Sequence, residues 1–130
     1  MLDHGAVLHA DGEPSGKLYV LFIPSKDEKG QPLKDQEVWA SSAGDLLTTL
    51  YGGATMMPPA QGKWLNDGGE IITEDVMLVH CYVKPKDEDD KGKLEQVAAF
   101  LHRMGKKTKQ GEVVIVVGEV MYRIRKYPLA

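Results

Sequence analysis

Three polar side chains share the period-two spacing of a β-strand within an apolar stretch near the middle of the chain. Glu74, His80 and Tyr82 have the same parity as Val76 and Leu78, so one strand would place all five on one face. A carboxylate, an imidazole and a phenol in an apolar cavity can carry out general acid–base catalysis, because burial raises the pKa of a carboxyl group toward neutrality. These three residues are candidates for a catalytic site.

A second candidate group lies near the C-terminus. Glu119 and Arg123 share parity with Val117 and Met121 in a run that predicts a single strand. Glu119 therefore joins the catalytic candidates, and Arg123 is a candidate for contact with a ligand or partner. The alternative interpretation is that these polar groups pair across an interface or reach solvent at strand ends, which is the commoner role of such groups.

The elements that must position these residues follow from the hydrophobic periodicity. Residues 1–16 are expected to form an N-terminal arm, and 17–130 a single domain. Apolar runs predict strands at residues 18–23, 54–66, 70–83 and 113–124. Amphipathic spacing predicts two helices, one from the cap Asp35 to Gly52-Gly53 and one from Leu94 to about Gly105, with a charged loop at 84–93.

The resulting order, β-α-β-β-α-β, is the ferredoxin-like arrangement of an α+β protein. It predicts a four-stranded antiparallel sheet in the spatial order 4-1-3-2, with two helices on one face. Pro58-Pro59 assigns the second strand to a sheet edge, because proline cannot donate to a sheet ladder. Residues 66–69, Asn-Asp-Gly-Gly, predict a tight turn before the third strand.

The predicted strands are apolar on both faces, and two helices can cover only one. In the first strand, Leu18, Val20 and Phe22 face one side while Tyr19 and Leu21 face the other. An antiparallel sheet with one wet face should instead alternate apolar with polar residues. We therefore expect the second face to be covered, first by a second copy of the chain, second by the N-terminal arm, and third by a hydrophobic ligand.

The middle third of the chain also carries a recurring pattern of residue types. It consists of a Trp in the first helix, a Gly-x-Thr, a Gly-x-Trp, and a Gly and a Glu in the hairpin, here Trp39, Gly53-Ala54-Thr55, Gly62-Lys63-Trp64, Gly69 and Glu74. This pattern resembles a family of small uncharacterised bacterial proteins of ferredoxin-like fold. The resemblance implies that fold and points to Thr55, Trp64 and Glu74, without implying a reaction.

Composition excludes several classes of function. The net charge of −3 over 130 residues argues against a nucleic-acid-binding domain, and no apolar run approaches the roughly 20 residues that span a bilayer. The single cysteine, Cys81, allows neither an internal disulfide nor a CxxC motif, and the N-terminus has no signal-peptide pattern. The expected location is therefore the cytoplasm.

No cofactor or metal is expected either. His4, His9, His80 and His102 lack the spacing of zinc ligands, and the acidic segment 87–98 lacks the terminal glutamate of a calcium loop. Cys81 shares parity with apolar residues and is expected to be a buried core residue rather than a nucleophile.

Two functions remain. The first is a homodimeric binding or regulatory module that uses its sheet face as an interface. The alternative is a small cofactor-free dimeric enzyme, of isomerase, lyase or oxygenase-like type, with Glu74, His80, Tyr82 and Glu119 around an acid–base pocket on the open sheet face.

Overall fold

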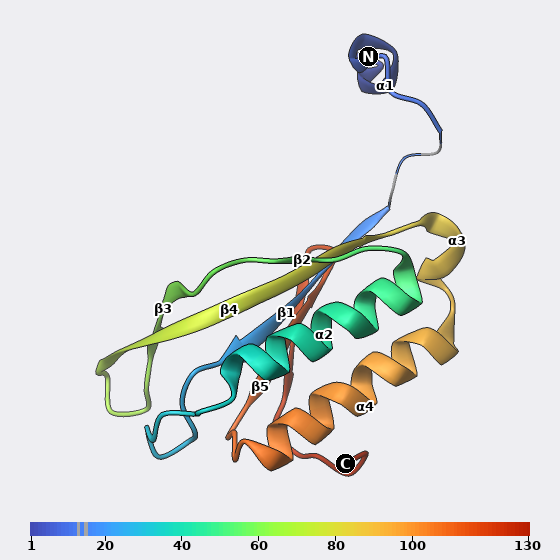
Figure 1. The fold of residues 1–130 in the computed structure, drawn as a ribbon. Helices are drawn as coiled ribbons and strands as arrows, with labels where there is room; N and C mark the ends of the chain where they lie inside the picture. Colours follow the sequence, from blue (N-terminus) through green and yellow to red (C-terminus); the bar gives the residue numbers. More distant parts are fainter. Residues whose placement is uncertain (13, 15) are drawn as a thin grey trace.

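An antiparallel sheet with two long helices packed on one of its faces forms the body of the molecule (Figure 1). The computed structural model describes residues 1–12, 14 and 16–130. The strands are β1 (Lys17–Pro24), β2 (Thr55–Met56), β3 (Ala60–Leu65), β4 (Ile71–Val83), β5 (Val113–Val117) and β6 (Val120–Ile124). The helices are α1 (His4–Leu8), α2 (Gln36–Tyr51), α3 (Pro85–Glu88) and α4 (Lys91–Lys107). The predicted α+β class is confirmed.

The order of strands across the sheet is β2-β4-β1-β5-β6, and β3 also pairs with β4. Thr55 of β2 lies opposite His80, and Ala60 of β3 lies opposite Val76, so β2 and β3 pair with successive parts of β4. Pro58-Pro59 separates the two short strands. The predicted second strand is thus an edge strand that is interrupted at its prolines, as expected.

The prediction of a single strand over residues 113–124 was wrong. β5 and β6 form a hairpin in which Val117 lies opposite Val120, with Gly118-Glu119 as the turn. Gly118 has φ 65°, the positive value that a type II′ turn requires at its first central position. The sheet therefore has six strands among the described residues, rather than the four of the predicted ferredoxin-like arrangement.

The hairpin also changes which face the last residues occupy. Directly paired residues of antiparallel strands point to the same face, so Met121 lies with Val116, and Arg123 lies with Val114. Val117 lies on the opposite, helix-covered face, where it packs against the core. The predicted grouping of Val117 with Met121 and Arg123 was therefore wrong, because two turn residues reverse the parity of the strand.

Both long helices begin near the predicted positions, and α4 is longer than predicted. Asp90 caps α4 by accepting a hydrogen bond from the backbone N–H of Lys93 at 3.1 Å. The helix then continues through Gly105, where a stop was predicted. The missing side chain of Gly105 leaves room for the ring of Tyr127, so this glycine has a packing role and does not end the helix. The predicted charged loop contains the short helix α3.

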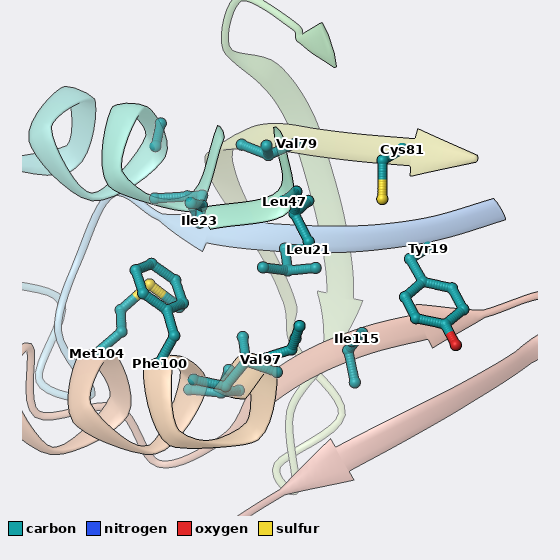
Figure 2. Close-up of a cluster of buried hydrophobic side chains, with 14 of the residues drawn as sticks. Tyr19, Leu21, Ile23, Leu47, Val79, Cys81, Val97, Phe100, Met104 and Ile115 are labelled. Atoms are coloured by element: carbon teal, nitrogen blue, oxygen red, sulfur yellow. The ribbon is translucent and has the colours of Figure 1, made fainter. Parts of the chain in front are cut away.

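The core lies between the helix-covered face of the sheet and helices α2 and α4 (Figure 2). Alternate residues of the two central strands and of β5 point toward buried side chains of both helices. The residues labelled in Figure 2 are Tyr19, Leu21, Ile23, Leu47, Val79, Cys81, Val97, Phe100, Met104 and Ile115.

The opposite face of the sheet is called here the open sheet face. Seven apolar side chains of β1, β4 and β5 on this face are half-buried: Leu18, Val20, Phe22, Val76, Leu78, Val114 and Val116. Neither long helix packs on it (Figure 1). The N-terminal arm does not pack on it either, because every described residue from 1 to 16 is exposed.

Candidate functional site

The three candidates on β4 all lie on the open sheet face, but they are spread along the strand. Residues in a strand advance about 3.3 Å each, so Glu74 is about 20 Å from His80 and about 26 Å from Tyr82. These three side chains therefore cannot act together on one small molecule within a single chain. They divide into three regions of the face.

The first region, the hairpin notch, consists of Gly62, Trp64, Ile72 and Glu74 on the paired strands β3 and β4. Gly62 lies opposite Glu74 and Trp64 lies opposite Ile72, so Trp64 and Glu74 are diagonal neighbours on one face. Gly62 has no side chain, and a Cβ there would contact the backbone oxygen of Glu74 and Cγ1 of Val76, each at 3.6 Å. A ligand placed over Gly62 would have both the carboxylate and the indole within reach.

The two functional groups of the hairpin notch are partly accessible. Trp64 is 53% exposed, and Glu74 is half-buried, with its Oε1 accepting a hydrogen bond from the backbone N–H of Ser25 at 3.3 Å. This contact ties the carboxylate to the loop that follows β1. An exposed indole binds cations and stacks on flat rings, and a carboxylate attracts a positive charge. The hairpin notch is thus suited to a ligand that is both aromatic and cationic.

The second region is the pair formed by Thr55 and His80. They lie opposite each other on β2 and β4, and Val20 lies opposite His80 on its other side. Thr55 is exposed, whereas the Nδ1 atom of His80 is buried with no hydrogen-bond partner among the described residues. Because Nδ1 is buried, a ligand or partner on this face can reach His80 only through the rest of the imidazole ring.

The third region, the end cleft, does bring two predicted residues together. Tyr82 and Glu119 line a cleft of about 500 Å³ at the end of the sheet where β1 begins, together with Lys17 and Gly118. Glu119 lies in the β5–β6 turn, and not on a strand as predicted. Sequence reasoning missed Lys17, because its place depends on β1 lying between β4 and β5.

Arg123 lies on β6, at the edge of the sheet opposite to that of Trp64 and Thr55. Its Nε atom is 3.8 Å from Glu112 Oε2, and Arg125 Nε donates to Glu112 Oε1 at 3.0 Å. Four interstrand spacings of about 4.8 Å separate the two edges, so Arg123 does not share a contact surface with Trp64.

A further feature, the helix-side groove, was not predicted. It is a cavity of about 230 Å³ between α4 and the β5–β6 hairpin, lined by apolar side chains that include Leu94, Ala98, Leu101, Val117, Tyr122 and Ile124. The groove exists because β6 extends the sheet beyond α4. The sequence predicted one continuous strand through residue 124, and such a strand gives no reason to expect this groove.

The structure also bears on metals, membranes and the cysteine. Within residues 1–12, 14 and 16–130, no three His, Cys, Asp or Glu side chains are placed to hold a metal ion. No helix in the same ranges is long and apolar enough to cross a membrane. Cys81 is buried, and burial raises the pKa of its thiol to about 11, so it is protonated near neutral pH and is a poor nucleophile.

The fold resembles that of a phage SAM lyase, an enzyme named for its action on S-adenosylmethionine (SAM). The structure of that lyase in complex with S-methyl-5′-thioadenosine aligns with a TM-score of 0.60 at 12% sequence identity, covering 88% of this chain and 94% of the lyase chain. A phage SAM lyase in its apo state aligns with a TM-score of 0.55 at 16% identity, covering 85% and 90%. At these identities, the likeness establishes a shared fold only.

Neither a protein-family model nor a curated protein matches the sequence.

Proposed function

We propose that this chain is a small lyase that cleaves a sulfonium substrate of the SAM class. The observation that carries the proposal is the likeness to the SAM lyase fold, which extends over most of both chains rather than over a shared substructure. It favours the enzyme alternative over the binding module, since the similar protein is itself an enzyme.

The hairpin notch supports this substrate class by its chemistry. SAM carries a flat adenine ring, a sulfonium cation and an α-ammonium group. The exposed indole of Trp64 can stack on the adenine or contact the sulfonium, and the Glu74 carboxylate can pair with a cationic group. Because Gly62 presents no side chain, a ligand over it would have both groups within reach.

The reaction itself needs little from the protein beyond binding and orientation. When the bond between sulfur and the γ-carbon breaks, its electron pair moves to sulfur, which leaves as the neutral thioether S-methyl-5′-thioadenosine. The substrate's own carboxylate can attack the γ-carbon and close a five-membered lactone, so atoms and charge balance without water. The chain's role is to hold the substrate in that bent conformation and to exclude water.

Glu74 then acts mainly on substrate binding. The sulfonium charge disappears in the transition state, so a carboxylate that contacts sulfur would stabilise the ground state more than the transition state. The α-ammonium group keeps its charge throughout the reaction. Pairing Glu74 with the ammonium group lowers KM without opposing the chemical step, and this is the role that we assign to it.

The proposal includes a second copy of the chain on the open sheet face. Seven half-buried apolar residues on this face would gain stability from burial, at up to about 25 cal/mol per Å² of apolar surface. A homodimer would also exclude water from the part of the open sheet face that lies between the hairpin notch and the end cleft. Both ends of the face can then contribute to sites at or near the interface.

The test is to incubate the protein with SAM and measure S-methyl-5′-thioadenosine by liquid chromatography and mass spectrometry, against a blank without protein. We expect product above the blank, with KM raised roughly 10-fold or more in Glu74→Gln, the loss typical of a hydrogen bond to a charged group. Asp75→Asn is the matched control, because Asp75 is exposed and faces the other side of β4.

Two further measurements sharpen the result. Gly62→Leu should block the notch, whereas Gly62→Ala adds only a Cβ about 3.6 Å from its neighbours and should fold normally. S-Adenosylhomocysteine, which lacks the sulfonium charge, keeps the ammonium group and should still compete for the site. If no product exceeds the blank at any SAM concentration, the lyase proposal is wrong and the binding module becomes the better interpretation.

A further inference from the structure

The N-terminal helix α1 is formed but unpacked. Its cap Asp3 accepts a hydrogen bond from the backbone N–H of Ala6 at 3.0 Å, and Leu2 and Val7 occupy the two positions of a hydrophobic staple around that cap. Leu2 and Val7 are each 62% exposed, and Leu8 is 73% exposed. An isolated helix of five residues is not stable in water. This helix therefore needs a packing partner.

The helix-side groove offers a surface of matching chemistry. Its lining is apolar, and Leu94 and Tyr122 on its two sides remain exposed. An apolar cavity of about 150 Å³ can hold a benzene molecule, so this groove of about 230 Å³ has room for one or two aliphatic side chains. The open sheet face, by contrast, is broad and is assigned to a second copy.

The connection between arm and body places the groove within reach. Val117 lines both the helix-side groove and the end cleft, and the end cleft includes Gly16 and Lys17, where the arm joins β1. Eight residues, 9–16, connect α1 to β1, and a chain of that length spans at most about 26–29 Å. A tether this short gives the helix a millimolar effective concentration at the groove.

We propose that α1 docks into the helix-side groove of its own chain, with Val7 and Leu2 packed against Leu101 and Tyr122. The docked arm covers the apolar residues that β6 leaves exposed beyond α4. This contact involves neither the hairpin notch nor the open sheet face, so it stands independently of the proposed lyase activity.

The test uses a nitroxide spin label on the full chain, attached at Ala10→Cys. Cys81 is buried and stays unlabelled, so the label reports only on the arm. Methyl NMR signals of Leu94, Leu101 and Ile124 should lose at least half of their intensity relative to the reduced label. Val7→Asp should restore them.

Val38→Asp is the matched control, because Val38 is 65% exposed on α2, away from the groove. It should leave the broadening unchanged. A mixture of spin-labelled chains without isotope and isotope-labelled chains without spin label separates the two modes of docking. Broadening that appears only when the same chain carries both the spin label and the isotope supports docking in cis.

Three results would overturn the proposal. The first is broadening in the mixed sample, which would mean docking on another copy. The second is broadening of the Val20 and Leu78 signals instead, which would place the arm on the open sheet face. The third is broadening that Val7→Asp leaves unchanged.

Discussion

Gly105 lies inside α4 beneath the ring of Tyr127, and replacing it with alanine sets two effects of opposite sign against each other. Within a helix, alanine is more favourable than glycine by about 0.8–1.0 kcal/mol. A Cβ on Gly105, however, would lie 2.8 Å from Cδ1 of Tyr127 and closer still to Cε1. The ring would therefore have to move.

Moving the ring breaks contacts whose strength can be estimated. The Tyr127 hydroxyl donates to the backbone oxygen of Gln110 at 2.8 Å, a hydrogen bond that contributes about 1 kcal/mol. The half-buried ring meets His102 edge-on at 6.0 Å, and its burial and aromatic contact contribute about 1–2 kcal/mol. After subtraction of the gain in helix propensity, Gly105→Ala should destabilise the protein by about 1–2 kcal/mol.

Urea denaturation followed by circular dichroism measures this change, and a double-mutant cycle tests its cause. In a Tyr127→Ala background the clash is absent, so Gly105→Ala should stabilise by about 0.5–1 kcal/mol. Gly92→Ala is the control in the same helix, because its Cβ would meet only the Asp90 carboxylate at 3.5 Å. If Gly105→Ala has the same sign in both backgrounds, Tyr127 does not pack on Gly105 and the reasoning is refuted.

Three other predictions concern the thiol, the last turn and the open sheet face. Burial raises the pKa of Cys81 from 9.0 to about 11, so the folded state holds the thiol proton more tightly than the unfolded state does. The thiol's contribution to stability should therefore be complete below pH 9 and be lost as the pH rises through 11. Cys81 should also react with a thiol reagent at pH 8 only after unfolding, and a native reaction at the rate of a free cysteine would contradict this. Gly118→Ala should destabilise by about 1–2 kcal/mol in urea denaturation because of its positive φ, with a smaller loss for Gly118→Asn, and equal losses would argue against a backbone cause. If the proposed dimer forms through the open sheet face, Val20→Lys should give a folded monomer in light scattering, and a mass that Val20→Lys leaves unchanged from a dimer would exclude this face as the interface.

The candidate site was predicted in its parts but not in its arrangement. Period-two spacing correctly placed Glu74, His80 and Tyr82 on the face away from the helices, because side-chain alternation is a local property of a strand. Their separation along β4 places Glu74 in the hairpin notch, His80 beside Thr55 and Tyr82 in the end cleft. Lys17 joined Glu119 and Tyr82 only through the pairing of β1 with two other strands, which no local pattern encodes.

Local sequence signals predicted the two long helices, the central strands, the proline-interrupted edge and the Asn-Asp-Gly-Gly turn. Each depends on residues close together in the chain, such as Gly69 with its φ of 79° or Gly52 at the end of α2. Tertiary structure decided the rest. Gly118 lies in an apolar run with no proline or asparagine beside it, so only the packing of β5 on β1 shows that the chain reverses there.

That reversal had the widest effect, because it changed the face of every following residue and widened the sheet beyond α4. Gly105 illustrates the same principle on a helix. Its local signal is a helix stop, but the ring of Tyr127, 22 positions later in the chain, occupies the space that a side chain would need. Contacts between residues distant in the sequence overrode local propensity at both glycines, since each local preference amounts to about 1 kcal/mol and a packed contact to as much or more.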